Sequence, residues 1–191
     1  MRRTLLIPIL LLFSAASSHA QAVSAYVTYS PIRLTNVETG TAFVPGAGNE
    51  IQYASYWANG FGGGITFNVI QLPFVSLGLD LRGSTKRGTL GADTGMAGLK
   101  LGIHPPIIHV KPYIEGAAGY LGTRTVSTSI PVGSTDNGTY ITWEILGGVD
   151  YPLFRFLDLR GIEVGGGQGI SHGSSSNASI FTINSGVVLH F

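Results

Sequence analysis

Cysteine is missing from all 191 residues of the chain, and charged residues are scarce. The absence of thiols excludes disulfide bonds and metal sites built on thiolates. Charged side chains make up 11% of the residues, and the formal net charge is +1, so the sequence lacks the basic surface that nucleic acids require. We expect no nucleic-acid partner, and the sequence shows no metal or cofactor motif, so we expect neither of these.

Long apolar runs are also absent after residue 20, although 44% of the residues are hydrophobic. A helix that crosses a membrane needs about 18 or more consecutive apolar residues, and no such stretch follows the N-terminal segment. The 28 glycines further disfavour long helices. Because only helices and closed barrels satisfy the backbone in lipid, this combination indicates a membrane β-barrel.

The first 20 residues are organised like a secretory signal peptide. Arg2-Arg3 precedes an apolar run over residues 4–16, and Ser18-His19-Ala20 offers a small-x-small cleavage site. Cleavage removes two of the eleven basic residues and none of the ten acidic ones. We predict a cleaved signal peptide over residues 1–20 and a single exported domain over residues 21–191.

Apolar and polar residues alternate with the period of two that is typical of β-strands. In residues 75–82, the valine and the leucines, Leu79 among them, point to one face, whereas Asp80 and Arg82 point to the other. The same pattern predicts further strands at 23–30, 64–69, 98–103, 110–123, 141–150 and 181–191.

One more strand contains a change of phase. Leu157 and Leu159 alternate with polar neighbours, but Ile162 and Val164 follow one residue out of step. A β-bulge at Gly161 would return these two residues to the apolar face, and glycine suits such a position.

The connections between the predicted strands differ in length. Short ones with proline lie at 71–73, 105–106 and 152–154, and longer polar ones at 31–55, 84–93, 124–138 and 166–177. Short turns at one end and long loops at the other are typical of outer-membrane barrels. We predict an all-β, eight-stranded antiparallel up-and-down transmembrane β-barrel, with both termini at the periplasmic end.

The C-terminus, Gly186-Val187-Val188-Leu189-His190-Phe191, resembles the signature strand that ends bacterial outer-membrane proteins. The whole mature chain is similar to the small OmpA/OmpX-type barrel domain of Gram-negative bacteria. The resemblance implies localisation in the outer membrane, contact with its lipid, and recognition of Val187, Leu189 and Phe191 by the barrel-assembly machinery. A small closed barrel has no strand edges to hide, so we expect a monomer.

Charged residues of both signs occur on the polar face of the predicted strands. The predicted lumen cluster comprises Asp80, Arg82, Lys100, Lys111, Glu115, Glu144, Asp158, Arg160 and Glu163. Buried charges must be paired, and side chains fill a barrel of eight strands. We therefore predict a salt-bridged plug; a narrow ion path is the alternative, and a wide porin-like solute channel is excluded at this strand number.

His172-Gly173-Ser174 is similar to the motif of outer-membrane lipid A deacylases, in which a histidine activates a serine. No acidic residue follows Glu163, so the acid that should orient the histidine is missing. We therefore predict that the protein is not an enzyme. Three other histidines, His104, His109 and His190, are expected at the periplasmic rim as polar residues and not as metal ligands.

Aromatic residues are expected to form a girdle at each membrane interface. The predicted periplasmic girdle contains Tyr151, Phe154, Phe156 and Phe191, and the external one contains Tyr56, Trp57, Phe61 and Tyr140. A carbohydrate-binding platform of Tyr53, Tyr56 and Trp57 is the alternative role for the external rings.

The sequence therefore predicts a structural or interaction protein whose external loops make surface contacts, although it identifies no ligand for them. Alternation shows two faces but not which of them points outward. A soluble, secreted, lipocalin-like barrel that binds a small apolar ligand is the alternative. Its leucines, such as Leu79, would point inward, and Asp80 and Arg82 would face water.

Overall fold

The computed structural model describes residues 23–44, 48–87, 90–125, 137–171 and 177–191, which form nine strands of one antiparallel sheet. The strands are β1 (Val23–Tyr29), β2 (Ile32–Val44), β3 (Gly48–Gln71), β4 (Val75–Arg87), β5 (Leu90–Ile103), β6 (Lys111–Thr125), β7 (Asn137–Phe154), β8 (Leu157–Ser171) and β9 (Ala178–His190). Within these ranges, no helix is long and apolar enough to cross a membrane. The predicted signal peptide lies outside the described residues.

β1 and β2 form a single stave of the barrel that is interrupted at Ser30 and Pro31. Both strands pair with β3 on one side and with β9 on the other, and the register does not shift between them. Proline has no N–H for the ladder, but the Ser30 N–H donates to the Gly60 carbonyl (2.9 Å), and the Pro31 carbonyl accepts from the Ile183 N–H (3.1 Å). The nine labelled strands therefore make eight staves.

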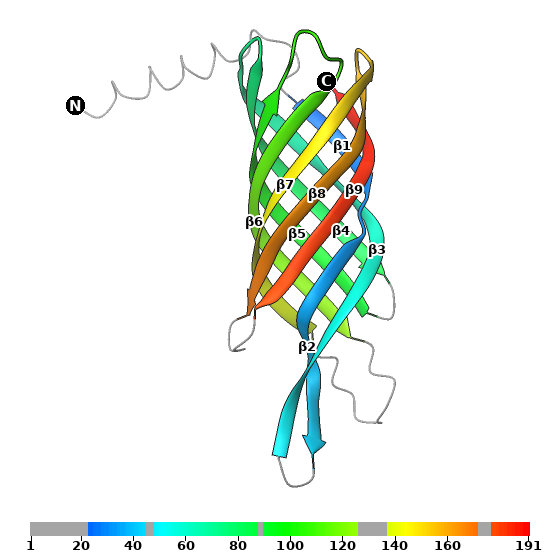
Figure 1. The fold of residues 1–191 in the computed structure, drawn as a ribbon, viewed down its shortest axis with the longest axis vertical. Coiled ribbons are helices and arrows are strands. Elements are labelled where there is room, and N and C mark those ends of the chain that lie inside the picture. The colour runs from blue at the N-terminus through cyan, green and yellow to red at the C-terminus, as the bar shows by residue number, and fades with distance from the viewer. Residues whose placement is uncertain (1–22, 45–47, 88–89, 126–136, 172–176) are drawn as a thin grey trace, which may run out of the picture.

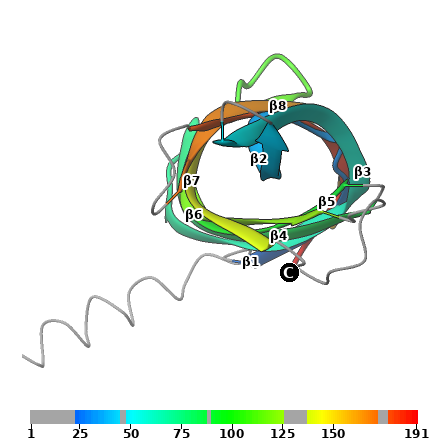
Figure 2. The same ribbon diagram turned by 90° about the horizontal axis from the view of Figure 1, so that it is seen from below.

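The sheet closes on itself because the first stave pairs with β9, the last. Consecutive strands from β3 to β9 pair as antiparallel neighbours, and Figures 1 and 2 show the resulting tilted, closed ring. The predicted eight-stranded antiparallel up-and-down barrel is confirmed. We call the end with Val23 and Phe191 the terminal end, and the opposite one the hairpin end.

Side chains alternate between the lumen and the outer surface, as the period of two predicts. Leu79 is 49% exposed on the outside, whereas its neighbour Asp80 is 1% exposed inside. The predicted bulge at Gly161 is also confirmed, because Arg160 pairs with Asp150 and Ile162 with Val149, which leaves Gly161 unpaired. The extra residue returns Ile162 to the outer surface.

The strands extend further toward the hairpin end than the sequence predicted. β2 and β3 occupy most of the predicted loop 31–55, and the strands that flank 84–93, 124–138 and 166–177 run into these segments. Much of these extensions is glycine, serine and threonine, which show no clear apolar alternation although the backbone ladder continues. The predicted short connection at 152–154 is also wrong, because Pro152 lies within β7.

β2 and β3 continue past the barrel wall as a projecting hairpin. Beyond Thr35 and Asn59, the described parts of these strands pair only with each other. Asn36 adopts a left-handed backbone (φ 60°) where the register shifts between Leu34 and Val37, and asparagine tolerates this conformation better than most residues. Seen along the barrel, the hairpin lies across the opening (Figure 2).

Candidate functional site

Arg82 on β4 is the centre of a layer of charged side chains across the lumen. Its guanidinium donates to Asp80 on the same strand (3.0 Å), to Glu115 on β6 (2.5 Å) and to Glu163 on β8 (3.0 Å). Arginine has five N–H donors in a fixed plane and can serve several acceptors at once. The contacts to Glu115 and Glu163 connect β4 with two other staves. Each of these carboxylates is shielded from water and therefore needs a positive partner.

Arg160 and Glu163 on β8 complete this layer, and both are buried. Arg160 donates to Asp150 on β7 (3.0 Å) and to Glu163 (3.4 Å). Glu163 also accepts hydrogen bonds from the Tyr113 hydroxyl (2.6 Å) and from the Asn184 amide (2.6 Å). Two residues three apart in a regular strand point to opposite faces, so the bulge is what places both charges in the lumen.

Two buried tyrosines lie against the guanidinium of Arg160. Its central carbon is 4.3 Å from the ring centroid of Tyr26 and 5.0 Å from that of Tyr113, within the range of cation–π attraction. Glycines opposite the rings make room for them, because a Cβ at Gly64 or Gly148 would lie 2.5 Å from the hydroxyl of Tyr26 or Tyr113. The layer is therefore packed as well as paired.

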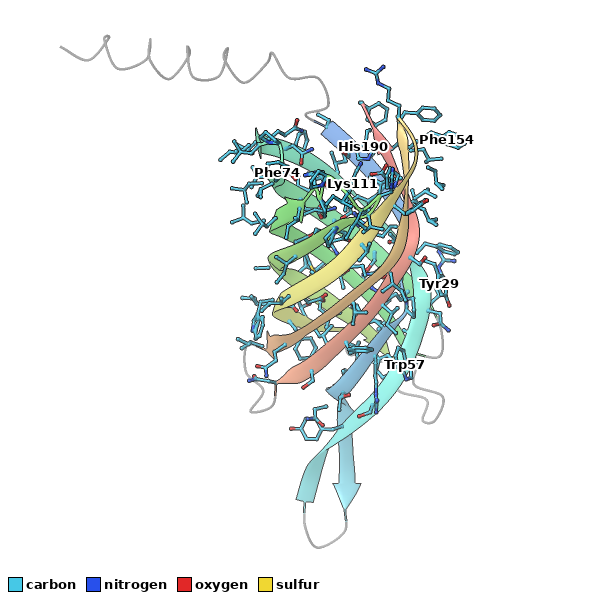
Figure 3. All side chains as sticks on the ribbon, turned by 45° about the horizontal axis from the view of Figure 1, so that its top comes forward. Tyr29, Trp57, Phe74, Lys111, Phe154 and His190 are labelled. Carbon is cyan, nitrogen blue, oxygen red and sulfur yellow. The ribbon has the colours of Figure 1, made fainter. Side chains whose placement is uncertain are left out.

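A cavity of about 350 Å³ lies between this layer and the terminal end. Two ion pairs line it: Lys100 with Asp150 (3.2 Å) and Lys111 with Asp158 (2.7 Å). The Nε2 atom of His190 also lies 2.8 Å from Asp158. Figure 3 shows Lys111 and His190 near this end of the barrel. The cavity can hold a small polar molecule.

The lumen changes character toward the hairpin end. Lys86 and Glu144 are buried beyond the charged layer, where they line a cavity of about 30 Å³, and the Lys86 ammonium donates to Ser84. Past them lies a cluster of buried apolar side chains: Ile32, Leu34, Val37, Ala58, Ala92, Leu121, Tyr140, Ala178 and Ile180.

All nine residues of the predicted lumen cluster point to the lumen side of the barrel. Eight of them make the side-chain ion pairs described above, Glu115 with Arg82 among them. The ninth, Glu144, lines the same small cavity as Lys86. The predicted cluster omits Asp150, Lys86, Tyr26 and Tyr113. Each of these residues occupies an inward-facing position in the period-of-two alternation of its strand. That position is the signal that could have identified it.

The three histidines of the predicted rim do not form one group. His190 is part of the lumen network, His104 lines the same cavity, and His109 lies with His104 beside a separate cavity of about 210 Å³ at the Pro105–Pro106 turn. Burial lowers the pKa of His104 below its ordinary value of 6.5, and the nearby Lys111 ammonium lowers it further. Among the described residues, no three acidic or histidine side chains converge as metal ligands would.

The aromatic residues only partly match the predicted girdles. The terminal end has exposed rings, with Phe154 and Phe156 stacked 6.0 Å apart. At the other end, Trp57 packs edge-on against Phe181, outside the barrel. The placement of Tyr140 and Tyr56 in the external girdle is wrong.

Tyr140 is buried in the apolar cluster, and Tyr56 is partly buried against it. Tyr56 therefore faces away from Tyr53 and Trp57, which are exposed, so the three rings form no common platform. Val187, Leu189 and Phe191 of the predicted assembly signal are exposed on the outer surface. His172, Gly173 and Ser174 lie outside the described residues.

This closed, eight-stave barrel, with charged side chains in its lumen and an apolar exterior, has the fold of the small outer-membrane β-barrels. Neisserial surface protein A is 15% identical and superposes with a TM-score of 0.50, over 87% of this chain and 97% of that structure. The N-terminal β-barrel domain of Pseudomonas aeruginosa OprF is 12% identical, with a TM-score of 0.52 over 91% of this chain and all of that domain. The sequence matches no protein-family model and no curated protein.

Proposed function

We propose that this chain is a small β-barrel of the bacterial outer membrane, with a structural or interaction role and with its lumen closed by side chains. The observation that carries the proposal is the sidedness of the wall. Leu79, Leu81 and the other outward residues of the staves are apolar and exposed, whereas Asp80 and Arg160 are buried inside. Such a surface suits lipid and not water.

The sidedness argues against the soluble, lipocalin-like alternative. That alternative requires the leucines of β4 in the interior and Asp80 at the surface. The structure has the opposite arrangement, and a carrier of apolar ligands would have to expose a continuous apolar belt to water. The interior half nearest the termini is moreover lined by charged and hydroxyl side chains.

The proposed closure of the lumen has two parts in series. The first is the layer around Arg82 and Arg160, whose guanidinium groups bond to carboxylates on four staves, β4, β6, β7 and β8. The second is the cluster around Leu34, whose buried side chains are aliphatic except for Tyr140. A narrow ion path would have to cross both, so we favour a closed barrel.

The terminal end would face the periplasm and the β2–β3 hairpin the exterior, because short turns lie at the first end and the longest strands at the second. The hairpin is then the part of the chain best placed to contact molecules at the cell surface. Lipid would contact the outer wall. A monomer suffices, because the closed ring leaves no unpaired stave in the wall.

Leu79→Arg tests the membrane proposal. A guanidinium at the middle of the lipid-facing wall costs about 2–4 kcal/mol, so we expect the variant to fail to insert into the outer-membrane fraction. Ser55→Arg, which places the same side chain on the exposed hairpin strand, is the matched control and should insert normally. The readout is the faster migration of the unboiled band in SDS gels. Normal insertion of Leu79→Arg would overturn the lipid-facing assignment.

Deleting Phe191 tests the proposed contact with the barrel-assembly machinery. Phe191 is exposed at the end of β9, and its N–H donates to the Val23 carbonyl (3.0 Å). We expect slower appearance of the folded band in cells, and unchanged folding rates of the purified chain in detergent, where no machinery acts. Equal slowing in both settings would assign Phe191 a structural role only.

A further inference from the structure

A series of three hydrogen-bonded polar side chains lies where the first and last staves pair and the barrel closes. The Ser24 hydroxyl oxygen lies 2.8 Å from Nδ1 of His190, and Nε2 of His190 lies 2.8 Å from Oδ2 of Asp158. The residues come from β1, β9 and β8, which are neighbours around the ring. Ser24 stands directly opposite His190 in the ladder, so the closing register itself brings the first pair together.

The donor and acceptor roles in this series of hydrogen bonds follow from Asp158, the last acceptor. Lys111 donates to Oδ2 of Asp158 at 2.7 Å, as expected of an ionised carboxylate, which can only accept. In neutral His190, the proton therefore lies on Nε2 and is donated to Asp158. Nδ1 is then an acceptor, and the Ser24 hydroxyl donates to it. This is the order of proton donors in a serine hydrolase, with the two ring nitrogens interchanged.

All three residues line the cavity of about 350 Å³ at the terminal end. A volume near the lower limit of small-molecule sites suits a short acyl group on a small polar alcohol. The lining is polar, with Lys100 and Lys111 as cations. Lys111 is half-buried beside Asp158, where its charge can favour the negative oxygen that forms when a carbonyl is attacked.

We propose that Ser24, His190 and Asp158 form a hydrolytic site for short-chain esters of polar alcohols. Ser24 Oγ attacks the ester carbonyl carbon, and its proton passes to Nδ1 of His190. The bond to the leaving oxygen then breaks, and His190 returns that proton to the alcohol. Water next attacks the acyl–Ser24 ester, gives one proton to His190, and releases the carboxylic acid as Ser24 recovers its proton.

Asp158 is a positioning residue in this scheme, because it orients His190 and stabilises the imidazolium without touching the substrate. This site is not the hydrolase-like motif found in the sequence, His172-Gly173-Ser174. Its chemistry is independent of the membrane proposal, and only its access from the periplasm depends on that proposal.

The first test treats the folded protein, in detergent, with a fluorophosphonate, which reacts covalently with activated serines. Mass spectrometry should find the label on Ser24 and not on Ser76, whose side chain lines the same cavity from β4. No label on Ser24 in protein that shows the heat-dependent gel shift would overturn the proposal.

The second test measures hydrolysis of p-nitrophenyl acetate. Ser24→Ala should reduce the rate to that of buffer, Asp158→Asn should reduce kcat at least about tenfold, and Ser55→Ala, on the exposed hairpin strand, should change little. His190→Ala should lose about a hundredfold or more, as for removal of a general base, and imidazole in solution should restore part of the rate. A purely structural role predicts neither labelling nor rescue, and full activity of folded Ser24→Ala would overturn the proposal.

Discussion

The half of the lumen nearer the termini is lined by arginine, lysine and carboxylate side chains, whereas the half nearer the hairpin is filled by Leu34 and its apolar neighbours. In the charged half, each group is stable only while its partners remain, because an unpaired charge in the barrel is costly. In the apolar half, stability comes from burial and close packing, and each side chain contributes by its own volume. The two halves should therefore respond differently to substitution.

Arg160→Leu should have the largest effect. It leaves Asp150 without its 3.0 Å partner and removes one of the two guanidinium groups beside Glu163, and breaking a buried pair in this way costs about 3–5 kcal/mol. The measurement is the free energy of unfolding in urea, with the protein in lipid vesicles.

Arg124→Leu is the matched control for this variant. Arg124 pairs with Asp93, but its side chain is 69% exposed, and exposed pairs contribute about 1 kcal/mol or less. Equal losses in Arg160→Leu and Arg124→Leu would mean that the charged half depends on its partners no more than the surface does.

Leu34→Ala should have an intermediate effect. Leu34 is fully buried in the apolar cluster, and its truncation should cost about 2–4 kcal/mol, because the surrounding side chains collapse only partly into the cavity. Leu81→Ala, on the outer wall, removes the same atoms where lipid can fill the space, and should cost clearly less in the same unfolding experiment. If Leu34→Ala costs no more than Leu81→Ala, close packing does not stabilise the apolar half.

His104→Gln should have the smallest effect, visible only in the pH dependence of stability. The pKa of His104 is lowered in the folded protein, so the unfolded chain binds its proton more readily. This histidine therefore makes folding less favourable as the pH falls through 6.5, and has no such effect above it. The free energy of unfolding should fall less steeply below pH 6.5 in the variant, and identical slopes would contradict the assignment.

The contrast between the two halves also explains what the sequence could predict. In the charged half, Asp80 and Leu79 differ sharply in polarity, so alternation separated the two faces of the strands, and the phase change after Leu159 located the bulge at Gly161. In the apolar half the inward face is itself apolar, so the contrast between the two faces is weaker. Ile180, which faces inward, and Phe181, which faces outward, cannot be separated by polarity.

The sequence could not predict the contacts of His190 with Ser24 and Asp158, for another reason. Ser24 and His190 are 166 positions apart in sequence, and they meet only because the first stave closes against the last. Alternation gives the face of a residue but not the register of a pairing between distant strands. The lengths of β2 and β3 were missed because their outer parts show no clear alternation.

The strand pairing of the outer β2–β3 hairpin has a consequence for engineering. Past Thr35 and Asn59 its described residues pair only within the hairpin, and β3 alone has 24 residues, which at about 3.3 Å per residue is more than twice the thickness of a bilayer core of about 30 Å. A peptide inserted between Val44 and Gly48 would therefore be displayed far from the membrane without altering any pairing of the ring. In the orientation proposed above, the barrel would serve as a compact scaffold for presenting foreign sequences on a bacterial surface.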